Sequence, residues 1–427
     1  MVGVSVSGGG SRAALFAAGT LEALGRLRVE EGRRSLLERV SYISSVSGGS
    51  LASAYYVLKK PGRDIPVLTE LGELSPDYQA FFTGFKEAMA NDYEGPLLWR
   101  NLLRWRWMNP AFAAKSLAEI LVEDYLGPET FKQLSERESR LDVPRLMINT
   151  TLYNDGRRLL LSTLPEDSNR YDLVKELRRI HGKDDIHPDD WALLDRRWGG
   201  LLSVNPQDLH IDVCRVRVAI SVAASMSFPP IIGPISLKDE KEKRYWHIGD
   251  GGMSDNTGAE SLLMVALRSL QQGTIRRALI IMIDSSFPFE VGGEALDHRA
   301  DGFSIFSYDF SRIPSIMEER SLAYRSLFVA GAQQLGLIPP PESLRFIRLR
   351  HTDAQWHDNL DDLPESCKKE KVNWKSPKDV GRHLAGVVTR LWLESSCDRD
   401  LVLAAAAKVV SQNEGRIKAF LEGPSHP

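Results

Sequence analysis

Cysteine is scarce in this sequence, and long apolar runs are missing from it. The 427 residues contain three cysteines, Cys214, Cys367 and Cys397, which are widely spaced and odd in number. Such a set argues against a disulfide framework and favours a reducing compartment. No apolar run reaches the roughly 18 residues that a membrane-spanning helix needs. No signal peptide is visible after Met1.

A strong excess of charge of either sign is also missing. The formal net charge is -3, with 26% charged and 43% hydrophobic residues. This balance is typical of a globular protein and gives no support to nucleic-acid binding. A chain of this length can bury a large core without disulfides, as one large domain with insertions or as two domains. The sequence contains no internal repeat and no low-complexity segment.

A glycine loop lies near the start of the chain. Residues Val2–Ser7 alternate β-branched and small side chains and predict a buried strand. Gly8–Gly10 follow, and residues 13–24 have helical periodicity. Strand, glycine loop and helix make an arrangement that binds anions. It can serve as a dinucleotide phosphate loop, as an oxyanion hole or as a simple tight turn. Ala13 breaks the dinucleotide spacing of glycines.

A serine occupies a second turn between a predicted strand and a helix. The apolar run Val40–Val46 leads to Ser47, and small residues including Gly48 and Gly49 follow it. A serine in this position is typical of a nucleophile elbow, in which strained backbone angles require very small neighbours. Ser45 stands where the usual elbow has its first glycine. An ordinary glycine- and serine-rich turn is the alternative.

An acidic residue follows a third predicted strand. Arg244–Gly249 predicts a short strand, and Asp250 comes next, before two glycines. Ala278–Asp284 is strongly apolar and predicts a central strand. Two closely spaced strand–turn–helix units predict a parallel α/β sheet with right-handed crossovers. Sheets of this kind place their sites at the carboxyl edge.

The remaining chain is predicted in less detail. Two strands form a hairpin at Asn154-Asp155-Gly156. We predict helices over 261–270 and 314–337, two more within 377–421, and a strand over 344–349. Residues 26–39 are predicted to be a helix end and a surface loop, and 165–206 a charged, irregular loop or lid. Residues 216–226 fit a strand at first and then a helix, which must end at Ser227-Phe228-Pro229-Pro230.

Tryptophan and arginine alternate within a mostly helical, aromatic region, residues 61–127. Trp99, Trp105 and Trp107 stand among three arginines, Arg100, Arg104 and Arg106. This composition suits a membrane interface, where tryptophan lies at headgroup depth and arginine meets phosphate. A helical cap packed on the core is the alternative.

Four motifs, taken in order, resemble those of the patatin-like phospholipase family, with features of the related cytosolic phospholipase A enzymes. They are the glycine loop with Arg12, the Ser47 elbow, the segment Ser225–Pro230 and Asp250-Gly251-Gly252. The resemblance runs from about residue 2 to about residue 285. It implies a three-layer α/β fold with a mostly parallel sheet flanked by helices. We expect a catalytic domain over 1–350, with a helical cap insertion at about 60–130 and a loop or lid insertion at about 165–208. A mostly helical extension, 351–427, is expected to pack on the core.

The resemblance implies a lipid acyl hydrolase with a Ser-Asp dyad. Ser47 would be the nucleophile and Asp250 its base, so that fatty-acyl esters of phospholipids or related lipids are cleaved through an acyl-enzyme. A carboxylate can act as this base if a dry pocket raises its pKa.

The glycine loop completes the implied site. Gly8, Gly9 and Gly10 would form the oxyanion hole, and Arg12 would meet a lipid phosphate unless it caps the helix or forms a surface ion pair. We expect no cofactor, no metal and no nucleic acid, but a lipid substrate at a membrane surface. The expected location is cytoplasmic or peripheral to a membrane, and we leave open whether a segment precedes Met1. Protein partners stay open.

Three other functions compete with this one. A Ser-His-Asp esterase needs a histidine, but strand alternation points His247 away from Asp250, and His351 and His357 fit a solvated polar loop better than a metal site. Asp255 and Asn256 are expected to stabilise a turn. A catalytically silent lipid-binding module on the same fold and a nucleotide-binding glycine loop are the remaining alternatives.

Overall fold

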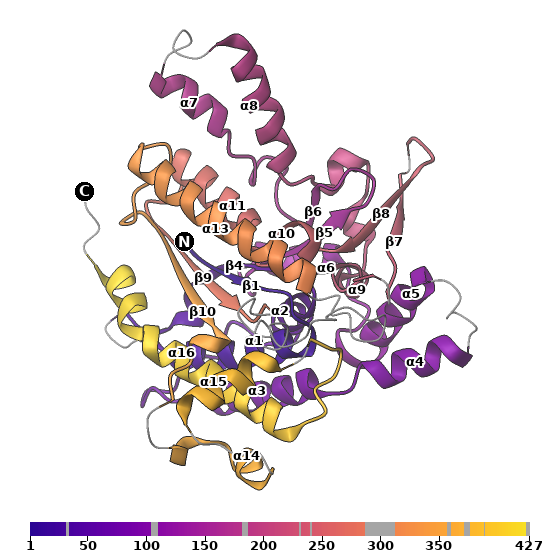
Figure 1. Ribbon diagram of the computed structural model, residues 1–427, viewed down its shortest axis with the longest axis vertical. Helices are drawn as coiled ribbons and strands as arrows, with labels where there is room; N and C mark the ends of the chain where they lie inside the picture. The colour runs from indigo at the N-terminus through magenta and orange to yellow at the C-terminus, as the bar shows by residue number, and fades with distance from the viewer. Residues whose placement is uncertain are drawn as a thin grey trace, which may run out of the picture.

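The structure is a computed structural model, and it places one large sheet between two layers of helices (Figure 1). It describes residues 1–30, 34–103, 110–181, 187–229, 232–239, 241–286, 312–356, 360–370, 376–387 and 389–423. Of the residues singled out above, six lie outside these ranges: Arg104, Trp105, Arg106, Trp107, Pro230 and His357.

The central sheet is mixed and mostly parallel. Within the described residues it has eight strands in the order β10-β9-β1-β4-β5-β8-β7, and β6 pairs with β5. The strands are β1 (Val2–Val6), β4 (Val40–Ser45), β5 (Arg145–Leu152), β6 (Arg158–Ser162), β7 (Ile235–Lys238), β8 (Tyr245–Asp250), β9 (Ala278–Asp284) and β10 (Leu344–Arg350). Neighbours from β10 to β5 run parallel, whereas β6, β7 and β8 pair in antiparallel fashion. The predicted fold class is therefore confirmed.

Helices cover both faces of this sheet (Figure 1). The longer ones are α1 (Gly10–Arg26), α2 (Gly48–Lys59), α3 (Pro76–Ala90), α4 (Glu94–Leu103), α5 (Pro110–Ile120), α6 (Phe131–Ser139), α7 (Leu173–His181), α8 (Pro188–Leu201), α9 (Val218–Ser225), α11 (Ala259–Gln271), α13 (Arg312–Gln334), α15 (Pro377–Gly386) and α16 (Ser396–Glu422). Short helices are η1 (Leu36–Arg39), η3 (Leu121–Tyr125), η4 (Pro206–Leu209), η5 (Val213–Arg215), α10 (Gly252–Asp255), η6 (His351–Asp353), η7 (Leu360–Asp362) and α14 (Glu365–Lys369). A small separate sheet pairs β2 (Arg28–Val29) with β3 (Arg34–Ser35).

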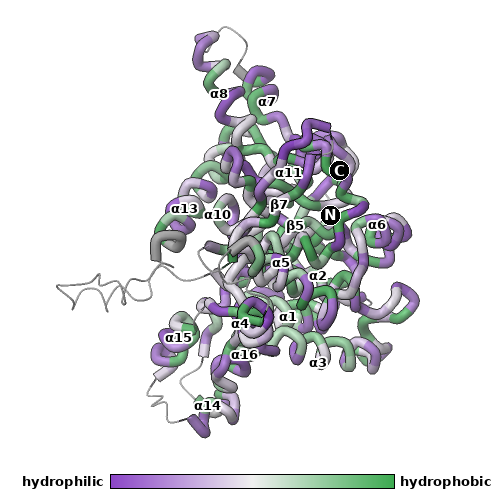
Figure 2. The backbone as a smooth tube through the Cα atoms, turned by 90° about the vertical axis from the view of Figure 1, so that its right-hand side faces the viewer, coloured by the Kyte–Doolittle hydropathy of each residue, from purple (hydrophilic) through white to green (hydrophobic). Residues whose placement is uncertain are grey.

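The strand β9 explains why two helical layers are needed. Leu279, Ile281 and Ile283 belong to the core shared with α1, α2 and α16. The alternate residues Ala278 and Ile280 belong to a second core, shared with α11. Because successive side chains of a strand point to opposite faces, an apolar run such as this one has to be covered on both sides. Figure 2 accordingly shows hydrophobic stretches gathered around the sheet.

The secondary structure predicted from local sequence patterns is confirmed in some regions and wrong in others. The hairpin at Asn154–Gly156 is confirmed, since β5 and β6 pair across it. The prediction of an irregular segment over 165–206 is wrong: it contains α7 and α8, which project from the body in Figure 1. The strand at the start of 216–226 is also wrong, because α9 begins at Val218 and Arg217 forms only an isolated bridge with Thr130. The predicted surface loop is also wrong in part, because residues 28–29 and 34–35 pair as β2 and β3, and 36–39 form η1.

The C-terminal residues build part of the main body. Helix α16 lies along α1, where a side chain at Gly19 would come within 3.0 Å of Ala406 and Leu403. Cys367 and Cys397 form a disulfide, and Cys214 is free and exposed. The expectation of unpaired cysteines was therefore wrong for two of the three, because the fold brings residues from α14 and α16 together. Among the described helices, none combines the length and hydropathy that a membrane span requires.

Candidate active site

The Ser47 turn is a strained junction between β4 and α2. Ser47 has φ 51° and ψ −126°, a backbone region that residues other than glycine seldom occupy. A Cβ on Gly48 would lie 2.0 Å from the carbonyl oxygen of Gly10, so glycine is required there for close packing against the glycine loop. Ser45 is fully buried and fits in the sheet as the last residue of β4. The substitution of serine for the usual first glycine is thus accommodated.

A chain of polar groups holds the backbone of this turn. The N–H of Ser47 donates to Oγ of Ser225 at 2.9 Å, and Oγ of Ser225 donates to the carbonyl oxygen of Asn149 at 2.7 Å. The side chain of Asn149 donates to the carbonyl oxygen of Ser45 at 3.0 Å. The sequence predicts a role for Ser225 only as part of the motif Ser225–Pro230, and it predicts none for Asn149. Nothing in the sequence near Asn149 marks it, because all these contacts join distant segments.

The strand register brings Asp250 to Ser47. Ser45 on β4 pairs with Ile148 on β5, and Thr150, two residues further along β5, pairs with Asp250. The two residues that follow Ser45 lead to Ser47, whose Oγ donates to Oδ2 of Asp250 at 2.8 Å. Strand β8 runs antiparallel to β5, and Asp250 is its last residue.

Burial controls the charge of the Asp250 carboxyl. Its side chain is only slightly exposed, and the N–H of Gly252 donates to Oδ1 at 2.7 Å. Loss of hydration raises the pKa of Asp250 to about 6, although the hydrogen bonds from Gly252 and Ser47 act in the opposite direction. A carboxylate with a raised pKa is a stronger base than an ordinary aspartate and is still mostly ionised at neutral pH.

The three glycines of the loop differ in whether their N–H groups already donate a hydrogen bond. The N–H of Gly8 donates to the carbonyl oxygen of Asn256 at 2.9 Å, so it is already used. Gly9 and Gly10 have φ 138° and 60°, and their N–H groups have no acceptor in the part of the chain that the structure describes. The loop lies against Ser47, because a Cβ on Gly8 would lie 3.2 Å from Cβ of Ser47.

Arg12 is buried beneath the loop, with no exposed surface. Its guanidinium donates to the carbonyl oxygen of Ser285 from Nε at 3.1 Å and from Nη2 at 2.9 Å, and Nη1 donates to the carbonyl oxygen of Val387. Burial lowers the pKa of Arg12 to about 10, which leaves it charged at neutral pH. In this arrangement the side chain holds backbone together and does not face solvent, where a lipid phosphate would be met.

Comparison with known proteins gives the family. A family profile described as "Patatin-like phospholipase" matches residues 4–263, more than half of the chain. The chain belongs to the patatin-like phospholipase family. No curated protein matches the sequence.

Solved structures of human GIVD cytosolic phospholipase A2 are similar at low identity. One has 13% sequence identity and a TM-score of 0.47, over 99% of this chain and 60% of that one. Another, in complex with methyl gamma-linolenyl fluorophosphonate inhibitor and terbium chloride, has 16% identity and a TM-score of 0.47, over 99% and 59%. The chain therefore spans about three fifths of the length of that enzyme.

The histidines predicted as alternatives stand apart from Ser47 and Asp250. His247 is exposed and bonds to Oγ of Ser236 at 2.9 Å, on the opposite face of β8 from Asp250, as alternation predicted. His351 is not on a solvated loop: it is fully buried against Phe16, and burial followed by the charge of Arg12 lowers its pKa to about 3. Within the described residues, no histidine is hydrogen-bonded to Ser47 or Asp250.

Two residues after the Asp250 turn do more than stabilise it. Asp255 accepts from the N–H of Thr257 at 3.1 Å, as expected for a turn, but also from Nη1 of Arg325 at 3.0 Å. Asn256 binds Gly8 through its backbone and donates from Nδ2 to Glu318 at 2.9 Å. Burial and then the charge of nearby Asp284 raise the pKa of Glu318 to about 7. Helix α13 is thereby connected to both loops of the site.

One group of side chains has the composition of a metal site. His210, Asp239 and Glu242 each place a ligand atom within 4.8 Å of the others. The Asp239 carboxylate, however, already accepts from Arg244 at 3.2 Å and from two backbone N–H groups. These bonds make it the cap of a tight turn, and we assign it no metal.

Proposed function

We propose that this chain is a serine lipid acyl hydrolase in which Ser47 and Asp250 form a catalytic dyad. The observation that carries the proposal is the 2.8 Å hydrogen bond from Oγ of Ser47 to a buried carboxylate whose pKa is raised. Membership of the patatin-like phospholipase family supports a fatty-acyl ester as the substrate. Phospholipids and related lipids are the substrate class that we propose.

Acylation begins with proton transfer. Asp250 takes the proton of Ser47 as the serine oxygen attacks the ester carbonyl carbon, and the protonated acid then gives its proton to the departing alcohol. Water subsequently attacks the acyl-enzyme, with Asp250 again accepting a proton, and releases the fatty acid. The strained backbone of Ser47 supports this role, because strain at a turn is a common way to fix a nucleophile.

The developing oxyanion needs hydrogen-bond donors. Gly9 and Gly10 offer N–H groups beside Ser47 that are not taken by the described residues, and α2 adds its positive N-terminal end. Each such donor is worth about 2.7–4 kcal/mol of transition-state stabilisation in other enzymes. Gly8 is left out of the proposed oxyanion hole, since its N–H is bound to Asn256.

Helix α4 offers a surface for lipid. Leu97 and Asn101 face inward, whereas four apolar side chains of the same helix are 57–74% exposed: Leu98, Trp99, Leu102 and Leu103. An apolar helical face of this kind can lie at the boundary of headgroups and acyl chains. We propose that the enzyme meets its substrate at a membrane surface through α4, so that replacement of Trp99 by alanine weakens vesicle binding and spares a soluble ester.

The Ser-His-Asp alternative has weaker support. His247 lies on the far side of β8, and His351 is buried with a pKa far below neutrality. A catalytically silent lipid-binding module would not need a hydroxyl and a buried carboxylate in direct contact. We therefore retain the dyad as the proposal.

Two measurements test it together. A fluorophosphonate probe should label the wild-type protein at Ser47 and leave Ser47→Ala unlabelled. Hydrolysis should then be measured on phospholipid, lysophospholipid and triacylglycerol with the same pair of proteins. A wild-type protein that is neither labelled nor active on any of these lipids would favour the silent module.

A further inference from the structure

A segment between α15 and α16 lies against the glycine loop. We call it the strap; it spans Val387–Ser395, of which residue 388 is outside the described residues. The N–H of Ser11 donates to the carbonyl oxygen of Arg390 at 2.7 Å. A Cβ on Gly10 would lie 2.3 Å from that same oxygen, so the strap and the loop are in close contact. The family profile ends at residue 263, and the strap lies beyond it.

Arg12 links the strap to the sheet through the base of the loop. Its guanidinium donates on one side to Val387 of the strap and on the other to the carbonyl oxygen of Ser285, which follows β9. The N–H of Ser285 in turn donates to Oγ of Ser7 at 2.8 Å, just before the glycines. A planar, rigid donor fork suits such a bridge between two fixed backbone oxygens. The loop is thus held from both sides by groups remote in sequence.

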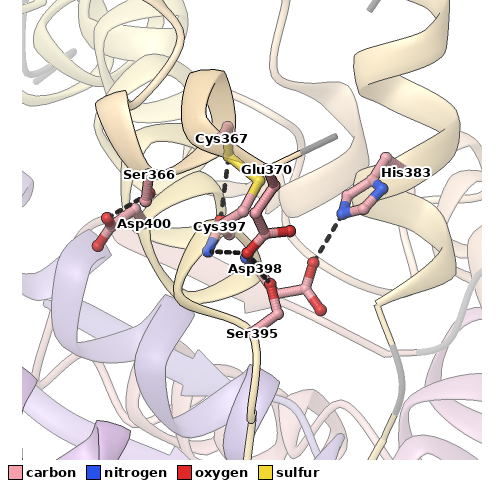
Figure 3. The surroundings of a disulfide bond; sticks show 8 residues. All are labelled: Ser366, Cys367, Glu370, His383, Ser395, Cys397, Asp398 and Asp400. Atoms are coloured by element: carbon pink, nitrogen blue, oxygen red, sulfur yellow. Dashed lines mark hydrogen bonds and ion pairs between the residues drawn. A yellow bond between two sulfur atoms is a disulfide. The ribbon is translucent and has the colours of Figure 1, made fainter. Parts of the chain in front are cut away.

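The far end of the strap is fastened by a compact group of contacts (Figure 3). Oγ of Ser395 donates to Oε1 of Glu370 at 3.0 Å and also accepts from the N–H of Asp398 at 3.0 Å. Asp398 is paired with Nε2 of His383 on α15 at 2.7 Å. Cys397, two residues beyond the strap, is joined by the disulfide to Cys367 on α14. Both cysteines are fully buried.

We propose that the strap is a positioning element for the oxyanion hole, with Arg12 as its positioning residue and the Cys367–Cys397 disulfide as its anchor. The proposal rests on the function proposed above. With the anchor in place, the strap fixes Ser11 and Gly10, and thereby the N–H groups that face the oxyanion. A misplacement of about 1 Å in such a site can lower turnover about 100-fold.

Reduction of the Cys367–Cys397 disulfide breaks the anchor of the strap. A dithiol reductant supplies two electrons and two protons, Cys367 and Cys397 become thiols, and the reductant becomes a disulfide. The strap then keeps its hydrogen bonds and the buried side chains of Val387 and Leu393. Because the strap contacts the glycine loop at Gly10 and Ser11, turnover number should fall while the KM for a soluble ester stays nearly unchanged.

The experiment uses the full chain and a soluble short-chain ester, with turnover expressed per site that a fluorophosphonate can label. Arg12→Lys keeps the charge and removes the fork, and should lower kcat about 10-fold to 100-fold. Cys367→Ala/Cys397→Ala should lower kcat several-fold. Cys214→Ala is the matched control, since that cysteine is free and exposed, and it should behave as the wild type.

A second readout separates positioning from mere folding. The affinity of a trifluoromethyl ketone, which forms an oxyanion on Ser47, should weaken by the same factor as kcat/KM in each variant. If the double variant does not fold, reduction of the folded wild-type protein, checked by thiol alkylation, gives the same comparison.

Several results would overturn the inference. Unchanged kcat and inhibitor affinity in Arg12→Lys would remove Arg12 and the strap from the site. A reduced protein as active as the oxidised one would remove the anchor. A wild-type protein without esterase activity or labelling would overturn the proposed function and this inference together. An active wild-type protein whose variants have the same kcat and inhibitor affinity would overturn the inference alone.

Discussion

Two buried aspartates, five residues apart, show how neighbours decide what a carboxylate does. Asp250 and Asp255 lie at the two ends of one short turn, and both side chains are almost fully buried. Burial raises the pKa of Asp250 to about 6, with only Gly252 and Ser47 as hydrogen-bond donors to oppose it. Burial acts the same way on Asp255, but the charges of Arg325 and Arg158 outweigh it and lower the pKa to about 2.

The difference separates the proposed base from a structural anchor. A carboxylate that faces two arginines holds its charge and fastens helix α13 to the turn, but has little tendency to accept a proton. A carboxylate that faces a serine hydroxyl without a cation keeps that tendency. The family motif points to Asp250, and the surroundings supply the physical reason why its neighbour cannot exchange roles with it.

The largest expected effect comes from Asp250→Asn. This change keeps the size of the side chain and removes its basicity, so the turnover of the folded protein should fall about 100-fold to 10,000-fold, or more. Ester hydrolysis by purified, folded protein is the measurement. Near-normal hydrolysis by Asp250→Asn would show that Asp250 is not the base and that its difference from Asp255 has no bearing on catalysis.

Asp255→Asn should lower the stability of the protein and leave its turnover number largely unchanged. This change removes one of the two carboxylates that pair with Arg325, the other being Glu260 at 2.9 Å, and breaking a buried ion pair destabilises a protein by up to about 3–5 kcal/mol. Urea unfolding should show this loss in the free energy of unfolding, whereas the protein that remains folded should keep most of its turnover number. A stable but inactive Asp255→Asn would show that the two acids share the chemistry.

The pH dependence should distinguish the acids again. The pKa of Asp250 is higher in the folded protein than its ordinary value of 3.8, so the folded state binds more protons and loses stability as pH rises from about 4 to about 6. Asp250→Asn should therefore unfold with a free energy greater by about 3 kcal/mol at pH 8 than the wild type, since two pKa units correspond to about that energy. This gain should disappear near pH 4.

Activity should also depend on the ionisation of Asp250. Lowering the pH should decrease the activity, whereas it increases the stability. Below about pH 6 Asp250 becomes protonated and cannot accept the proton of Ser47, so kcat/KM should fall as the pH is lowered through that value. Asp255 titrates near pH 2 and should contribute stability that is lost only as the pH falls from about 4 to about 2. An activity profile that is flat between pH 5 and pH 8 would contradict the assignment of Asp250 as the base.

The smallest effect is expected from a histidine. His247 shares β8 with Asp250 but is exposed and bonded to Ser236 on the opposite face. His247→Gln should keep turnover within about two-fold, as for a surface substitution remote from the site. A large loss in this variant, with Asp250→Asn still active, would restore the Ser-His-Asp alternative.

Local patterns predicted much of the site. Ser47 and Asp250 could be proposed as site residues because a strand, a small-residue turn and a helix have signals within a dozen residues. The hairpin at Asn154–Gly156 was found for the same reason. Failures came where local composition was ambiguous, as in 165–206, whose charged residues form the exposed helices α7 and α8. Helix α7 does have an apolar stripe, with Leu173 and Leu177 on the second core, but it spans only nine residues among many charged ones.

The sequence by itself determined which groups can react, because the strained serine turn and the glycine loop are local backbone features. Only the tertiary structure decided which of them are available: Gly8 is bound by Asn256, Arg12 is buried between Ser285 and Val387, and Cys367 meets Cys397. Each of these pairings joins segments that no periodicity connects. A hydrogen bond or a disulfide depends on distances of a few ångströms in space, and the packing of the whole chain sets those distances.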